Sequence, residues 1–317
     1  MSQSPGLITG PHQKIAVSHP RERFTAQLFD ALWSQYRHRV SYVQMYEQLL
    51  RSHGGTFVND HIAFRTFATQ SPATGIHSLG RIFEALGYLP AGTYAFPDKH
   101  LSAIHFQHEN PEFPKLFISE LQTWKLEDAA QRIITANVQQ HRPLLSEETL
   151  TALWKIDRNE GQDELLARVV AAFSELPWPT PQREAVTELN RASQYGAWVL
   201  VHGYNVNHFT SLINSHGVEA LDDIEKTSAA LAQLGVPMKK EIEGAVGSAL
   251  RQTATEAVTI DVPIIDQGQS TTMPWSYAYF ELAQRDWSVD PSTNRRYRFE
   301  GFLGAQATQL FEMTKVK

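Results

Sequence analysis

The sequence predicts an α+β protein with a curved, mostly antiparallel β-sheet, or half-barrel, made of two related units with helical additions. Three observations carry this prediction. The segment 58–65, around His61, is echoed by the segment 205–211, around His208. An apolar helical stretch ending in Leu-Gly follows each histidine, and each unit closes on an aromatic-rich strand ending in Glu-Leu. A duplicated strand–helix–strand–strand unit with His at its head and Glu at its tail suggests a metal held between two similar halves.

The first unit follows a long helical segment. Apolar residues recur at helical spacing over 23–52, with a break near residue 40, and His53-Gly54-Gly55 ends the pattern. Residues 56–67 are rich in β-branched and aromatic side chains and predict a strand. The remaining elements of this unit are a helix over 76–86, two short strands within 88–108 around a turn at 97–99, and a strand over 115–121.

A stretch of different character joins the two units. Helical patterns cover 126–138, 147–154 and 163–174, and a Pro-rich segment follows them. We interpret this stretch as a helical cap without chemistry rather than as part of a catalytic site. The second unit is predicted to contain a strand over 197–204, a helix over 221–234, and strands over 239–242, 248–256 and 276–285, with a short helix over 301–313 after them.

These patterns suggest one principal domain. Residues 1–22 lack periodicity, so we expect a weakly ordered N-terminal segment. Residues 23–317 then form a single catalytic domain, with the first unit at about 56–122, the helical insertion at about 123–195 and the second unit at about 196–300.

Composition excludes several functional classes. The net charge is −6 and no Lys/Arg cluster stands out, which argues against nucleic-acid binding. The absence of cysteine excludes disulfides, thiolate metal sites and a Cys nucleophile. No apolar run is long enough for a membrane span, and the first residues do not resemble a secretory signal. We therefore expect a cytoplasmic protein; its oligomeric state stays open.

His61 and Arg65 are the first candidate site residues. In a regular strand they share one face with Ala63, whereas Asp60 points to the other face and is left out of the predicted site. An Arg on an inward apolar face is costly unless it meets an anion, and its planar fork suits a carboxylate. The alternative is that His61 is a core histidine and that Arg65 pairs with a nearby Asp.

Glu281 is the third candidate ligand. It lies in a strand that is apolar on both faces, where a carboxylate needs a cationic partner. Two imidazoles and one carboxylate with open positions form the facial triad of non-haem Fe(II) oxygenases, although the same set could bind Zn²⁺. An ion pair with Arg285 is the alternative for Glu281. Glu120, its apparent counterpart in the first unit, ranks below it as a ligand.

These motifs carry a family resemblance. The segment 58–67, together with Val206-Asn207-His208 and Tyr279-Phe280-Glu281, resembles the 2-oxoadipate dioxygenase/decarboxylase family, which is related to the vicinal-oxygen-chelate superfamily. The resemblance covers about residues 25–300. It implies paired βαβββ units and oxidative decarboxylation of 2-oxoadipate by O₂ to 2-hydroxyglutarate and CO₂, in lysine catabolism. It also implies that His61, His208 and Glu281 bind Fe(II), and that Arg65 binds a carboxylate of the 2-oxo dicarboxylic acid.

Three further residues are weaker candidates for substrate binding. The amide of Gln252 could hydrogen-bond a substrate oxygen, although a packing or turn role competes with it. Ser119 lies on the strand over 115–121, where a structural role is the alternative. Arg285 shares a strand face with Glu281 and is predicted to orient it.

Two other functions stay open at this point. Another vicinal-oxygen-chelate activity, such as an isomerase, a lyase or an extradiol dioxygenase, would use the same ligands with a different divalent metal and would not need Arg65. A non-catalytic small-molecule binding protein would bind no metal and would consume no O₂.

Overall fold

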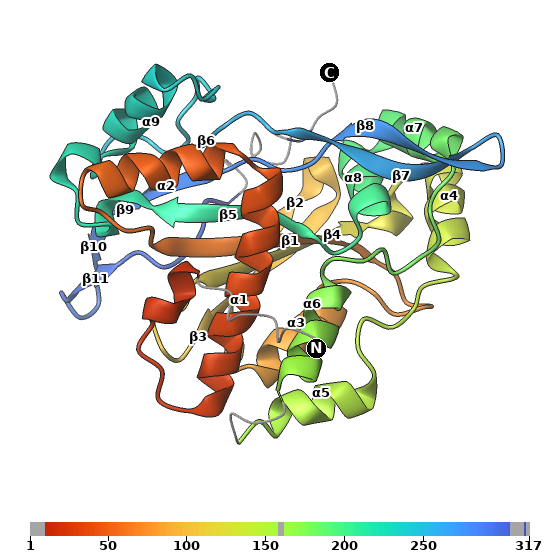
Figure 1. Ribbon diagram of the computed structural model, residues 1–317, viewed down its shortest axis with the longest axis horizontal. Coiled ribbons are helices and arrows are strands. Elements are labelled where there is room, and N and C mark those ends of the chain that lie inside the picture. Colours follow the sequence, from red (N-terminus) through yellow and green to blue (C-terminus); the bar gives the residue numbers. More distant parts are fainter. Residues whose placement is uncertain (1–9, 158–161, 305–313, 315–317) are drawn as a thin grey trace, which may run out of the picture.

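The computed structural model describes residues 10–157, 162–304 and 314, and a seven-stranded sheet runs through them (Figure 1). Its strands, in chain order, are β1 (Asn59–Ala68), β2 (Tyr88–Phe96), β3 (Leu101–His108), β4 (Lys115–Gln122), β5 (Val206–Leu212), β6 (Leu250–Ala254) and β9 (Glu281–Arg285). They lie in the order β2-β3-β4-β1-β5-β9-β6. The predicted fold class, a curved and mostly antiparallel sheet, is confirmed.

The sheet has an internal two-fold pattern. The first strands of the two units, β1 and β5, pair antiparallel at its centre. On either side the last strand of each unit pairs parallel with the first: β4 with β1, and β9 with β5. Antiparallel strands then extend both edges. The strand predicted over 239–242 is wrong as a regular element, because only isolated bridges, Met238–Thr255 and Glu243–Gln252, occupy the place that β2 holds in the first unit.

Equivalent helices follow the first strand of each unit, and the sequence predicted both. They are α3 (Ile76–Ala85) and α9 (Ile224–Gln233). The long N-terminal helical segment is also confirmed, with its break: α1 (Pro20–Arg39) and α2 (Tyr42–Ser52). The ring of Trp33 on α1 lies 5.0 Å from that of Phe209 on β5, so aromatic packing joins this helix to the centre of the sheet.

The inserted segment is helical, and it is longer than predicted. It contains α4 (Asp128–Val138), α5 (Glu147–Trp154), α6 (Asp163–Ala172), α7 (Arg183–Ala192) and α8 (Gln194–His202). The strand predicted over 197–204 is wrong, because those residues lie mostly in α8. Every residue from Tyr195 to His202 is buried. A short run that is apolar on all sides has no period with which to distinguish a buried helix from a buried strand.

The second unit contains a hairpin that the sequence analysis missed. Strands β7 (Thr259–Asp266) and β8 (Gln269–Ser276) pair antiparallel beside α7 and α8 (Figure 1). Gln267 and Gly268, both with positive φ, form the tight turn. The strand predicted over 248–256 corresponds to the shorter β6. The strand predicted over 276–285 is also shorter than expected, because residue 276 ends β8 and β9 begins only at residue 281. A small hairpin of β10 (Trp287–Val289) and β11 (Arg296–Arg298) follows.

Short 3₁₀ helices complete the described chain. They are η1 (Pro11–Lys14), η2 (Pro97–Lys99), η3 (Thr123–Lys125), η4 (Ile213–Ser215) and η5 (Glu219–Leu221). Because η1 and the start of α1 precede residue 23, regular structure begins earlier than the predicted boundary. Residues 1–9 and most of the helix predicted over 301–313 lie outside the described residues. None of the described helices has both the length and the hydropathy of a membrane span.

Gly203 connects α8 to β5, and we expect it to tolerate no side chain. Its φ of 60° and ψ of −128° strain any other residue, and a Cβ atom would lie 2.8 Å from the Cδ of Pro177. Gly203→Ala should lower the free energy of unfolding by about 2 kcal/mol, measured by urea denaturation. Gly235→Ala is the matched control, with positive φ but open space around the Cβ position; it should lose only about 1 kcal/mol. Equal losses would contradict the expected clash.

Candidate metal centre

Three buried side chains from three adjacent strands converge at one point. They are His61 on β1, His208 on β5 and Glu281 at the start of β9. The two Nε2 atoms lie 3.3 Å apart, and each lies 3.4 Å from an oxygen of the Glu281 carboxylate. The structure thus brings the three predicted ligands together.

Strand register explains this convergence. His61 is the partner of Thr210 across β1 and β5, and Glu281 is the partner of Thr210 across β5 and β9. One row across three strands therefore carries both ligands, with the Thr210 hydroxyl between them, 3.0 Å from His61 Nε2 and 3.3 Å from Glu281 Oε1. His208 lies two residues before Thr210, on the same face of β5. The sequence analysis missed Thr210, which carries no signal distinguishing it from other strand threonines.

The donor geometry fits a metal ion. With bonds of about 2.0–2.1 Å, donors 3.3–3.4 Å apart subtend about 110° at a common centre. Glu281 Oε2 is buried and has no hydrogen-bond partner among the described residues. The Nδ1 atoms of both imidazoles have acceptors, so the lone pairs with which the rings would bind an ion are on their Nε2 atoms. A cation would supply the positive partner for the carboxylate and for the two imidazole lone pairs.

Burial controls the protonation of the three ligands. It raises the pKa of Glu281 to about 8, against the opposing hydrogen bond from Gln252. It also lowers the pKa of His61, which Asp60 partly offsets, and it lowers that of His208 well below the ordinary value. The imidazoles are therefore neutral near pH 7, as metal ligation requires. The carboxylate needs a cation to be ionised there.

Arg65 lines the same cavity as the three ligands. Its side chain is 2% exposed, and its guanidinium lies 5.0 Å from the ring centre of Tyr195 and 5.2 Å from that of Trp198. Nη1 donates to the Thr314 hydroxyl at 2.8 Å. Among the described residues no carboxylate pairs with Arg65, so the alternative of a nearby Asp partner is wrong there. A buried guanidinium without a carboxylate is suited to binding an anionic ligand.

Gln252 and Ser119 also line the cavity. Gln252 Nε2 donates to Glu281 Oε1 at 2.7 Å, so its amide supports a candidate metal ligand. The hydroxyl of Ser119 lies 2.9 Å from that of Tyr195. Tyr279, whose ring stacks on His208 at 4.8 Å, is a further wall residue that the sequence analysis left without a role.

Arg285 does not take the position that the sequence analysis gave it. It is absent from the cavity lining, and it pairs with Asp60 rather than with Glu281. Both the orienting role toward Glu281 and the alternative Glu281–Arg285 ion pair are therefore wrong. The reason is a β-bulge at Asp60, which breaks the alternation of β1 and brings Asp60 Oδ2 within 2.7 Å of His61 Nδ1. Asp60 was left out of the predicted site on the assumption of a regular strand.

The apparent equivalence of Glu120 and Glu281 is also wrong. In β1 and β4, the register position that matches Glu281 is Phe117, the partner of Ala63. Phe117 lines the cavity, whereas Glu120 accepts a hydrogen bond from the Ile76 amide at the start of α3. The first unit therefore contributes one candidate ligand and the second unit two.

The cavity beside the ligands is small and partly apolar. Its volume is about 50 Å³, which is larger than the volume that a single water molecule needs. Aromatic rings cover it, and Phe302 lies with its ring centre 4.8 Å from that of His61. The site thus combines a few converging polar groups with walls that exclude bulk water.

Comparisons with known proteins agree with this geometry. The family model described as 2-oxoadipate dioxygenase/decarboxylase matches residues 26–313. A rice protein named 2-oxoadipate dioxygenase/decarboxylase, chloroplastic/amyloplastic, is 29% identical over 286 residues, covering 84% of this chain and 72% of the rice protein.

Solved structures share the fold. A putative glyoxalase superfamily protein from Ralstonia eutropha has a TM-score of 0.77 at 24% identity, covering 95% of this chain and 91% of its own. The rice hydroxyglutarate synthase, solved in complex with 2-oxoadipate, has a TM-score of 0.75 at 24% identity, covering 99% and 97%. With a family match that spans most of the sequence and includes all three converging side chains, the chain belongs to the 2-oxoadipate dioxygenase/decarboxylase family.

Proposed function

We propose that this chain is an Fe(II)-dependent enzyme that converts 2-oxoadipate and O₂ into 2-hydroxyglutarate and CO₂, a reaction of lysine catabolism. The observation that supports this most strongly is the buried His61–His208–Glu281 cluster, which shares one cavity with the guanidinium of Arg65. Family membership and the 2-oxoadipate bound to the rice protein support the substrate class.

The donor set is compatible with the proposed iron. His61, His208 and Glu281 would hold it as two neutral imidazoles and one carboxylate, which leaves coordination positions open. When bound, the iron supplies the activation of O₂ and the polarisation of the 2-oxo acid. In the overall reaction the C1–C2 bond breaks and C1 leaves as CO₂ with its own two oxygen atoms. One atom of O₂ ends in the new carboxylate at C2 and the other in the hydroxyl group of the product. The substrate provides the electrons, so no other reductant is required.

The protein's own residues would bind and orient the substrate. Arg65 would hold the carboxylate far from the reacting carbon, because its five donors match a carboxylate in a bidentate pair. Gln252 would keep the Glu281 carboxylate in place through the hydrogen bond described above. Tyr279 and Phe302 would keep bulk water from the reacting atoms, which strengthens the polar interactions inside.

Oxygen uptake tests the proposal directly. The protein would be loaded anaerobically with Fe(II) and then given O₂ and a panel of 2-oxo acids. We expect uptake with 2-oxoadipate, with one CO₂ and one 2-hydroxyglutarate formed for each O₂ consumed. Zn²⁺-loaded protein is the control and should consume none, since Zn²⁺ has no redox chemistry. Absence of uptake with every acid in the panel would contradict an oxygenase.

Substitution of Arg65 separates the proposed function from the other metal-dependent activities. Arg65→Met should lower kcat/KM for 2-oxoadipate by about 100-fold, the loss typical of a buried charged pair. With 2-oxohexanoate, which lacks the second carboxylate, the variant and the wild type should differ little.

The control for Arg65→Met is Arg251→Met. This substitution removes another buried guanidinium, which pairs with Glu225 rather than lining the cavity, and it should leave both substrates unaffected. Equal losses for the two acids in Arg65→Met would contradict the proposed carboxylate contact.

The raised pKa of Glu281 predicts how the stability of metal-free protein changes with pH. A folded-state pKa of about 8 lies above the ordinary value of 4.5, so the stability associated with the protonated form is lost as the pH rises through about 8. Between pH 6.5 and 8.5 the metal-free wild type should lose about 2 kcal/mol relative to Glu281→Gln, which cannot ionise. Denaturant titration of both proteins at both pH values measures this. Parallel curves would mean that the carboxylate is not desolvated.

A further inference from the structure

Each ligand histidine directly follows the extra residue of a β-bulge. Across β1 and β5, Asn59 is the partner of Ser211 and His61 that of Thr210, so Asp60 is the unpaired residue. In the same ladder, Ala63 is the partner of His208 and Phe64 that of Val206, so Asn207 is unpaired in β5. A bulge changes the direction of the side chain that it carries. The two units therefore share one local arrangement, in which an Asp or Asn at a bulge is followed by the ligand His.

Both bulge residues hydrogen-bond the imidazole that follows. Asp60 Oδ2 lies 2.7 Å from His61 Nδ1, and Asn207 Oδ1 lies 2.9 Å from His208 Nδ1. A carbonyl or carboxylate oxygen only accepts, so each Nδ1 is the protonated nitrogen and each Nε2 carries the lone pair that faces the other ligands. The bulges thus select the tautomer and the ring orientation of both candidate ligands.

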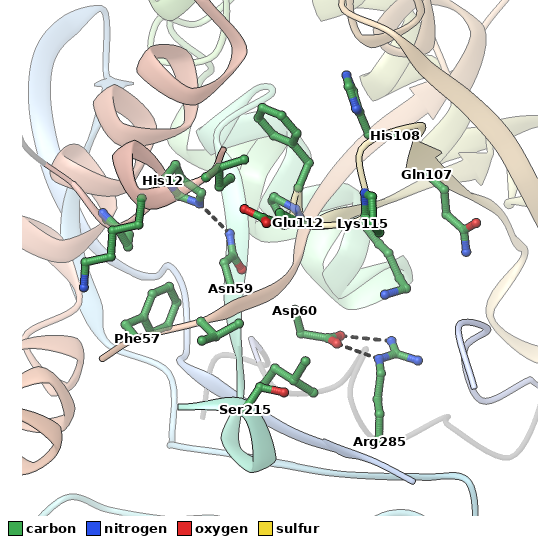
Figure 2. A pocket seen from close by; sticks show the side chains of 18 of the residues that line it. His12, Phe57, Asn59, Asp60, Gln107, His108, Glu112, Lys115, Ser215 and Arg285 are labelled. Carbon is green, nitrogen blue, oxygen red and sulfur yellow. Dashed lines mark hydrogen bonds and ion pairs between the residues drawn. The ribbon is translucent and has the colours of Figure 1, made fainter. Parts of the chain in front are cut away.

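The two halves differ in charge. Asp60 is an anion held by Arg285: Nε donates to Oδ1 at 2.6 Å and Nη2 to Oδ2 at 2.9 Å (Figure 2). Both side chains are fully buried, beside a separate cavity of about 480 Å³. Asn207 is neutral, and its Nδ2 has no hydrogen-bond partner among the described residues. Of the two ligand histidines, only His61 therefore donates its Nδ1 hydrogen bond to a negatively charged group.

Arg285 also reaches the segment that covers the site. Its Nη1 donates to the carbonyl oxygens of Phe299 and Gly301, and its guanidinium lies 5.0 Å from the ring centre of Phe302. Phe302 in turn packs against His61. The same guanidinium thus fixes the Asp60 carboxylate and the backbone next to the aromatic cover.

We propose that Asp60, held by Arg285, is the positioning residue of the metal centre and makes His61 a stronger donor than His208. The hydrogen bond from His61 Nδ1 to a carboxylate increases electron density on the ring, which strengthens the bond of Nε2 to a cation. Arg285 keeps the carboxylate from rotating away and compensates its buried charge. This inference depends on the metal centre proposed above.

Asp60→Asn/Arg285→Gln is the informative variant. The new amide at position 60 would still accept from His61 Nδ1, as Asn207 does for His208, so the double substitution removes the charge and leaves no buried ion unpaired. Co²⁺ serves as the probe, with its affinity measured by chelator competition and its coordination by the visible absorption bands. We expect the variant to bind Co²⁺ about 10-fold more weakly or worse, with shifted bands.

Asp30→Asn is the matched control. Asp30 and His12 form another buried carboxylate–imidazole pair, joined at 2.8 Å, but His12 is outside the ligand cluster. This control should bind Co²⁺ like the wild type. A loss below about threefold in the double variant, or an equal loss in the control, would overturn the positioning role while leaving the metal centre intact. If the wild type itself fails to bind one equivalent of Co²⁺, both the metal centre and this inference are contradicted.

Discussion

The buried carboxylate of Glu281 is the constraint on which the structure of the site depends. Its side chain is fully buried and faces two imidazole nitrogens that have no proton to donate, so the ionised form is unstable without a cation. Removing any one of the three ligands would leave an incomplete donor set for that cation. The strand order β1-β5-β9 makes their convergence possible, since each strand contributes one ligand within hydrogen-bond range of its neighbours.

The two structurally similar units contribute unequally to the site. The β1–β5 pair at the centre brings the two histidines together from equivalent positions in the two units. At the next equivalent pair, however, the first unit has Phe117 and the second has Glu281. The first unit therefore places an aromatic ring, and not a third ligand, at this position of the cavity wall. The two bulges differ in the opposite sense, with Asp60 of the first unit anionic and Asn207 of the second neutral.

Local sequence patterns were sufficient for much of the fold but failed where tertiary context decides. The helices α3 and α9 and the strands β2, β3 and β4 were predicted because their periodicity and turn residues are local signals. Residues 197–204 were assigned to a strand because α8 is apolar on every side, which removes the amphipathic signal. Asp60 was excluded because strand alternation does not hold at a bulge, and a bulge depends on the partner strand.

The sequence by itself determined which residue types are available and that they occur in a repeated order: a His at the head of each unit, an Arg four residues after the first, and a Glu near the end of the second. Those features, with the family resemblance, were enough to identify the three converging side chains. Only the tertiary structure decided which residues form hydrogen bonds and ion pairs around these side chains. Arg285 pairs with Asp60, and Gln252 pairs with Glu281, because strand register and a bulge set these contacts between residues that are distant in the chain.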